Sequence, residues 1–243
     1  MNNNLLLFTL CIIPALILMI YVYINDKVEK EPLFLLILLF IGGIVSSVIS
    51  YSVALILKMK FPFLNFHYSD MNIFQLIFKL FIIIAVVEEL SKWLINMICT
   101  WKNKNFNYIF DPIVYSVFIS LGFASFENLL YGFNYSSYGF VMVFLRGIIS
   151  VPCHAVFGVF MGCFIGIAKK FQIKKKNTMM IKYIILSIMV PIILHFIYDL
   201  LLVNLNKITL AVFIIYVLLL YCFAYLNIEK FNSNKTLVQK KDI

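Results

Sequence analysis

Apolar stretches long enough to cross a lipid bilayer follow one another along most of this 243-residue chain. A helix needs roughly 20 apolar residues to cross the hydrocarbon core. Because 63% of the residues are hydrophobic and only 13% are charged, the composition excludes an ordinary water-soluble globule. We therefore predict an all-α fold, a polytopic transmembrane helical bundle of about seven spans, near residues 5–24, 33–57, 73–101, 112–131, 138–168, 182–203 and 208–228.

Polar connections separate the predicted spans, and none is long enough to fold as a soluble domain. We expect one integral-membrane domain over residues 1–228, with its motif-bearing core at about 85–203, and a short polar tail at 229–243. The first span has no basic segment before it and no small-x-small cleavage site after it. This pattern favours a retained helix over a removed signal peptide.

The basic residues lie mainly in alternate connections between the spans. Only Lys58, Lys60 and Lys207 fall on one side of the predicted membrane. The other side carries Lys27, Lys30, Lys102, Lys104, Lys169, Lys170, Lys174, Lys175, Lys176, Lys182, Lys230, Lys235, Lys240 and Lys241. By the positive-inside rule the amino terminus is outside and the carboxyl terminus is cytoplasmic. The net charge of +9 therefore indicates topology, and we expect the bilayer and no nucleic acid as a partner.

Ionisable side chains interrupt four of the apolar spans. An ionisable group at mid-bilayer costs at least a few kcal/mol unless it finds a partner or water, so each one is a candidate functional residue. The eight residues of this kind are Glu88, Glu89, Lys92, Glu127, Arg146, His154, His195 and Asp199. Together they suggest a built active site.

The third span carries the motif Glu88-Glu89-x-x-Lys92. Lys92 lies at i+4 from Glu88 and at i+3 from Glu89, so its ammonium can reach either carboxylate. One glutamate can then be neutralised while the other faces a cavity as a general base. The alternative is a buried ion pair with a purely structural role, but such a pair needs one glutamate and here the costly residue is doubled.

The next three spans repeat the theme of polar groups on one helix face. Asn128 follows Glu127 directly, and Arg146 precedes His154 by two turns. His195 and Asp199 are spaced i, i+4, so this pair can bind a metal, or the carboxylate can orient the ring.

These residues carry a resemblance to a known family. The motifs Glu88-Glu89-x-x-Lys92, Phe123-x-x-x-Glu127-Asn128-x-x-Tyr131, His154-x-x-x-Gly158 and His195-x-x-x-Asp199, in this order on successive spans, resemble those of the PrsW family of intramembrane proteases. The resemblance covers about residues 85–200 and implies a relation to the CAAX-processing and bacteriocin-processing membrane proteases. It implies a single-pass membrane protein as substrate, typically an anti-sigma factor, and hence regulated intramembrane proteolysis. Asp111-Pro112 departs from the Asp-Gly of many members.

The predicted topology lets these groups converge in one water-filled cavity, because successive spans run in opposite directions. Our hypothesis is that Glu89, or else Glu88, activates water, and that His154 and His195 stabilise the oxyanion or bind a metal. In the metal alternative, Glu127 or Asp199 is the third ligand of a zinc ion.

The remaining site residues have supporting roles in this hypothesis. Asp199 orients His195, and Lys92 or Arg146 balances charge. Asn128 offers a neutral donor and acceptor beside Glu127, and Phe123 and Gly158 support the site. The rival classes are a proton- or ion-coupled transporter, which would commonly show internal repeats that are not seen here, and a non-catalytic membrane scaffold. A composition rich in Lys, Ile, Asn and Phe indicates a bacterial source, and therefore a multi-pass protein of the bacterial cytoplasmic membrane.

Overall fold

A computed structural model describes residues 3–134, 139–203, 206–233, 236 and 238 of the chain. The described elements are helical, as predicted. They are α1 (Asn3–Asn25), α2 (Leu33–Lys60), the 3₁₀ turns η1 (Pro62–Asn65) and η2 (Tyr68–Asp70), α3 (Ile73–Ile77), the π-helix η3 (Phe78–Val86), α4 (Val87–Thr100), α5 (Asp111–Asn134), α6 (Gly139–Ile148), α7 (Ser150–Ile173), α8 (Asn177–Val203) and α9 (Lys207–Asn232).

Six helical stretches among the described residues are long and apolar enough to cross a membrane. They correspond to six of the seven predicted spans, with α6 and α7 together forming one of them. The predicted span at 73–101 is instead the succession α3, η3 and α4. A π-helix has more residues per turn than an α-helix and is found frequently at functional sites. Here the π-helix ends at Val86, two residues before Glu88.

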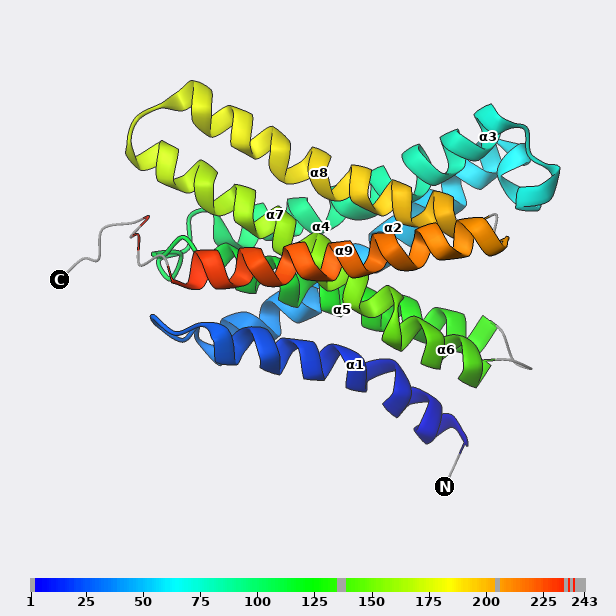
Figure 1. Cartoon of the computed structure of the whole chain (residues 1–243), viewed down its shortest axis with the longest axis horizontal. Coiled ribbons are helices and arrows are strands. Elements are labelled where there is room, and N and C mark those ends of the chain that lie inside the picture. The colour runs from blue at the N-terminus through cyan, green and yellow to red at the C-terminus, as the bar shows by residue number, and fades with distance from the viewer. Residues whose placement is uncertain (1–2, 135–138, 204–205, 234–235, 237, 239–243) are drawn as a thin grey trace.

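Helices α5 and α7 form the centre of the bundle. In the apolar window of α5, 78% of the residues are buried, against 22–39% for α1, α2, α8 and α9. Figure 1 shows α9 crossing in front of α5 and α7, with α1 below them and α8 above. The outer helices expose many large apolar side chains, as lipid-facing surfaces do. The most buried side chains of the fold therefore lie on α5, on α7 and where other helices touch these two.

Glycines allow the central helices to approach closely. A Cβ atom on Gly122 of α5 would lie 2.0 Å from the carbonyl oxygen of Phe40 in α2, and a Cβ on Gly43 would lie 2.0 Å from the carbonyl oxygen of Ile119. The reciprocal contact means that only glycine fits at this crossing. The α5–α7 crossing relies on Gly158, where a Cβ would lie 2.9 Å from the carbonyl oxygen of Ser116.

The predicted span at 138–168 contains a break that the sequence analysis did not anticipate. Its first residue, 138, lies outside the described residues, and the helix is interrupted at Ile149, between α6 and α7. Pro152 has no N–H to donate to the carbonyl of Ile148, which weakens the helix at this point. The hydroxyl of Tyr221 in α9 lies 3.4 Å from that carbonyl oxygen and 3.2 Å from the carbonyl oxygen of Ile149, so it can donate to either of them.

The lysine-rich connections gather at one end of the bundle. The α1–α2, α4–α5 and α7–α8 connections and the end of α9 lie at the left in Figure 1, and the start of α1 lies at the opposite end. The segregation of charge predicted along the sequence is therefore present in space. Lys235, Lys240 and Lys241, and most of the predicted tail beyond Asn232, lie outside the described residues.

Candidate active site

Helices α4, α5, α6, α7 and α8 bring their ionisable side chains to one place inside the bundle. Glu89 and Lys92 of α4 form the innermost ion pair, with 2.7 Å between Nζ and Oε1 and neither side chain exposed. The same Oε1 lies 2.9 Å from Nδ1 of His195 in α8. On its other side Nζ of Lys92 lies 3.0 Å from Nδ1 of His154 in α7. Lys92 thus joins a carboxylate one turn away to a histidine 62 residues later.

The hydrogen-bond network assigns the protons of both rings. A lysine ammonium only donates, so Nδ1 of His154 is an acceptor and its Nε2 donates to Oε2 of Glu127, at 3.1 Å. Nδ1 of His195 donates to Glu89. Nε2 of His195 lies 3.5 Å from Oδ2 of Asp199, beyond a good hydrogen bond, so its lone pair remains available to a ligand. Glu89, where we had expected Asp199, therefore has the contact that orients His195.

Glu127 belongs to a second, more open network. Its Oε2 lies 2.7 Å from a terminal guanidinium nitrogen of Arg146 in α6, whose Nε donates to Oδ1 of Asn128 at 3.2 Å. The guanidinium also lies over the ring of Tyr131, 3.9 Å from its centre. The side chains of Glu127 and Asp199 are each 18% exposed, whereas those of the inner network are at most 4% exposed. The site is therefore most accessible beside Glu127 and Asp199.

Aromatic rings wall the inner network. The ammonium of Lys92 lies 4.0 Å from the centre of the Phe123 ring, and that ring lies 5.5 Å from the ring of His154. Phe157 stacks on His195 with 5.0 Å between ring centres and an angle of 22°. Sequence reasoning missed Phe157. The chain has 25 phenylalanines, and nothing in the spacing of Phe157 distinguishes it from the others.

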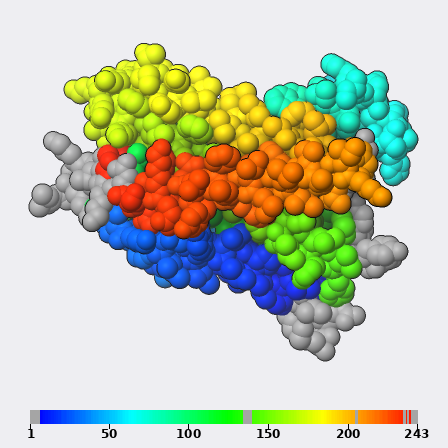
Figure 2. All heavy atoms as spheres, viewed as in Figure 1, coloured from blue at the N-terminus to red at the C-terminus, as the bar shows by residue number. Residues whose placement is uncertain are grey.

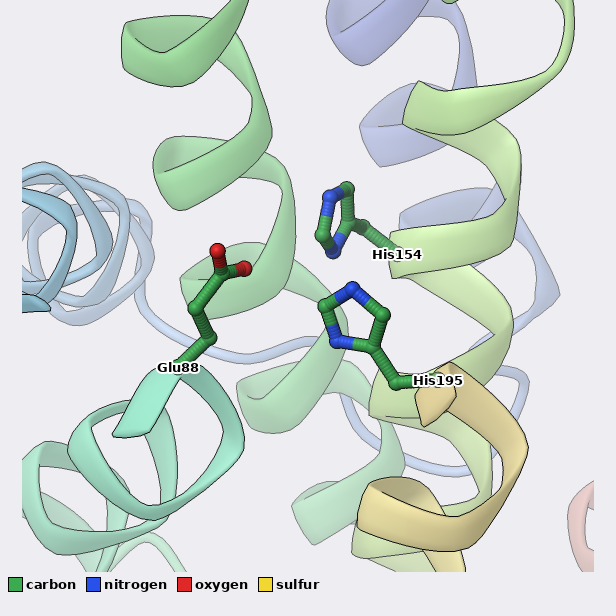
Figure 3. A group of neighbouring side chains, drawn as sticks. All are labelled: Glu88, His154 and His195. Atoms are coloured by element: carbon green, nitrogen blue, oxygen red, sulfur yellow. The ribbon is translucent and has the colours of Figure 1, made fainter. Parts of the chain in front are cut away.

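Glu88, His154 and His195 are the group best placed to hold a metal ion. One ligand atom from each of the three lies within 4.8 Å of the other two. Figure 3 shows Glu88 pointing from α4 toward the two rings, which come from α7 and α8. The buried Oε2 of Glu88 has no hydrogen-bond partner among the described residues, as an oxygen reserved for a cation would. One carboxylate and two imidazoles fit a catalytic zinc site, which has three protein ligands.

This grouping differs from the sequence-based expectation in one residue. We had expected Glu127 or Asp199 as the third metal ligand and Glu89 or Glu88 as the base. In the structure Glu89 is engaged by Lys92 and His195, and Glu127 is engaged by Arg146 and His154. Glu88 is the carboxylate that stands beside both histidines.

Two further motif residues lie away from this network. Gly158 lies at the α5–α7 crossing, one turn from His154, and it acts through helix packing. Oδ2 of Asp111 accepts the backbone N–H groups of Asn107 and Tyr108, at 2.8 and 2.6 Å, and so closes the loop that starts α5. Asp111 is thus a loop-closing residue.

Histidines, carboxylates and a lysine, enclosed by helices long enough to cross a membrane, are typical of an intramembrane hydrolase. The sequence profile described as PrsW family intramembrane metalloprotease matches residues 31–226. Proteins named Protease PrsW from Oceanobacillus iheyensis and Clostridioides difficile are 33% and 34% identical to the chain over 225 and 229 residues. These matches cover 92% and 94% of this chain, and 94% and 92% of the relatives. Protease PrsW of Bacillus subtilis is 32% identical over 197 residues, covering 81% of this chain and 82% of the relative.

The chain therefore belongs to the PrsW family and is a multi-pass intramembrane protease. The resemblance drawn from the motifs is confirmed, and the protease interpretation stands over the transporter and the scaffold. No solved structure matches the chain.

Proposed function

We propose that this protease hydrolyses a peptide bond of a single-pass membrane protein, and that Glu88, His154 and His195 hold one divalent cation at its active site. The proximity of these three side chains carries the proposal. When bound, zinc in such a site polarises the scissile carbonyl and lowers the pKa of water.

The other residues of the site position these ligands. Glu89 accepts the Nδ1 proton of His195, which directs the Nε2 lone pair toward the site, as a carboxylate behind a ligating histidine does. Lys92 balances the charge of Glu89. Because Lys92 also occupies the Nδ1 lone pair of His154, it must release that nitrogen before His154 can bind a cation there.

We propose Glu127 as the group that accepts the proton of the attacking water. It is a partly exposed carboxylate 3.1 Å from Nε2 of His154, and Arg146 compensates its charge. This assignment replaces Glu89 as the preferred base, because the side chain of Glu89 is fully buried, whereas that of Glu127 is 18% exposed. Asp199, equally exposed on the neighbouring helix, faces the same opening.

We infer that the substrate is a signalling protein such as an anti-sigma factor, cut in or near the extracytoplasmic half of the bilayer. When positions along the predicted spans are converted to helix rise, Glu127 and Asp199, which are also the more open groups, come out nearer the outer face. The amino terminus outside, the cytoplasmic carboxyl terminus and a single protease domain at residues 1–228 are part of the same proposal.

The test is cleavage in proteoliposomes, with tagged single-pass membrane proteins as substrates and mass spectrometry of the new termini. Glu88→Gln and Glu127→Gln should each abolish cleavage, because the shape is kept while a ligand or a base is lost. His67→Ala is the matched control, since this third histidine lies in the exposed loop between η1 and η2. Wild-type cleavage in both glutamine variants, or termini on the cytoplasmic side, would contradict the proposal.

A further inference from the structure

A basic cavity lies outside the catalytic site, where α7, α8 and α9 meet at the lysine-rich end of the bundle. Its volume is about 340 Å³, within the usual range of ligand pockets. Lys170, Lys174 and Lys230 line it together with the rings of Phe171, Tyr183 and Phe231, and none of the residues lining it is acidic. In Figure 2 the surface of α7 is visible where α8 and α9 diverge.

Lys170, Lys174 and Lys230 have no carboxylate partner among the described residues. The adjacent Lys169 provides the contrast: its Nζ donates to the carbonyl of Trp101 at 2.6 Å and lies over the ring of the same residue. Three positive charges around one cavity repel each other, and a bound anion would offset this repulsion.

The cavity wall is largely aromatic. Tyr183 of α8 stacks on Phe171 of α7 with 5.4 Å between ring centres and an angle of 8°. Tyrosine is enriched at the level of lipid headgroups, because its ring is apolar and its hydroxyl is polar. The wall therefore suits a ligand that lies between water and hydrocarbon.

An exposed apolar stripe leads from the cavity along α9. Leu226, Phe223 and Leu219 lie on the same helix face as Lys230, at i−4, i−7 and i−11, and each is at least 50% exposed. A charged group at the end of a helix, followed by an apolar stripe toward its middle, matches a ligand with an anionic head and a long apolar tail. A free anion would need no such stripe.

We propose that this cavity binds the phosphate headgroup of an anionic phospholipid, whose acyl chain lies along α9. Lysine is a common phosphate ligand in proteins, and basic pockets between transmembrane helices bind anionic headgroups. In the proposed orientation the lipid belongs to the cytoplasmic leaflet. The binding site is separate from the catalytic residues, so its test does not depend on proteolysis.

The experiment is native mass spectrometry of the full-length protein in mild detergent, titrated with phosphatidylglycerol. Each lysine is worth roughly fivefold in affinity, so Lys170→Gln/Lys174→Gln/Lys230→Gln should weaken binding on the order of 100-fold. The matched control is Lys102→Gln/Lys104→Gln/Lys182→Gln, which removes the same charge from exposed positions at the same end of the bundle and should change binding less than twofold.

Phosphatidylcholine and soluble glycerol phosphate complete the test, and both should bind at least tenfold more weakly than phosphatidylglycerol. If the cavity variant does not fold, Lys230→Gln alone replaces it, because a change at one exposed side chain should not prevent folding. This single variant should weaken binding roughly fivefold. Equal losses in the cavity and control variants would overturn the proposal in favour of general surface attraction. Equal binding of glycerol phosphate would overturn it in favour of a free-phosphate site.

Discussion

Replacing Lys92 by methionine should strongly destabilise the protein. The Lys92–Glu89 pair is 2.7 Å long and fully buried, so the variant leaves a carboxylate without its counter-ion. Breaking a buried ion pair from one side costs about 3–5 kcal/mol. For a chain of this size that corresponds to a fall in melting temperature of roughly 6–20 °C. Cleavage should also be lost, because Glu89, which orients His195, loses its counter-ion.

A double-mutant cycle separates this effect from simple loss of packing. In Lys92→Met/Glu89→Gln no uncompensated charge remains, so the loss of stability should be smaller than the sum of the single losses by about 2–3 kcal/mol. The assay is thermal unfolding of detergent-solubilised protein, with Lys102→Met as the control on an exposed loop. Additivity within about 0.5 kcal/mol, or equal effects of Lys92→Met and Lys102→Met, would refute the reasoning.

Three further outcomes follow from other parts of the structure. Arg146→Lys should reduce cleavage in the proteoliposome assay, because a lysine cannot bridge the carboxylate and amide of α5 while stacking on an aromatic ring. Gly122→Ala should lower the yield of folded protein far more than Gly132→Ala. The new Cβ would lie 2.0 Å from the backbone of Phe40 in the first variant, but at least 2.9 Å from the nearest side chains in the second. Equal yields of the two variants would contradict this. Burial raises the pKa of Glu31, in the α1–α2 loop, from 4.5 to about 9. Between about pH 5 and pH 9 the folded chain therefore holds a proton that the unfolded chain releases. The free energy of unfolding should fall over this range by at most ~1.4 kcal/mol per pH unit. Glu31→Gln should flatten this pH dependence in thermal melts, and an unchanged pH dependence would exclude Glu31 as its cause.

The helices and the local pairs could be predicted from the sequence, because both depend on neighbours along the chain. The boundaries of α2 and α5 follow from the length of the apolar runs, and the Glu89–Lys92 contact follows from the i, i+3 spacing. The break at Ile149 also had a local signal, since Pro152 removes a helical hydrogen bond, but that signal was not used.

Contacts between helices that are far apart along the chain could not be predicted from the sequence. Which glutamate of the pair lies beside both histidines depends on the rotation of α4, and α4 directly follows the π-helix η3. A helical wheel with 3.6 residues per turn fails across a π-helix. The Lys92–His154 contact depends in turn on how closely α5 and α7 pack, which the glycine at position 158 allows.

Metal content tests the central claim most directly. Full-length protein purified without chelator, analysed by inductively coupled plasma mass spectrometry, should contain about one divalent metal ion per chain. His154→Ala, His195→Ala and Glu88→Gln should each lose the metal while remaining folded, and His67→Ala should keep it. Full cleavage activity in rigorously metal-free protein, or unchanged metal content in all three site variants, would contradict a metal centre formed by these side chains.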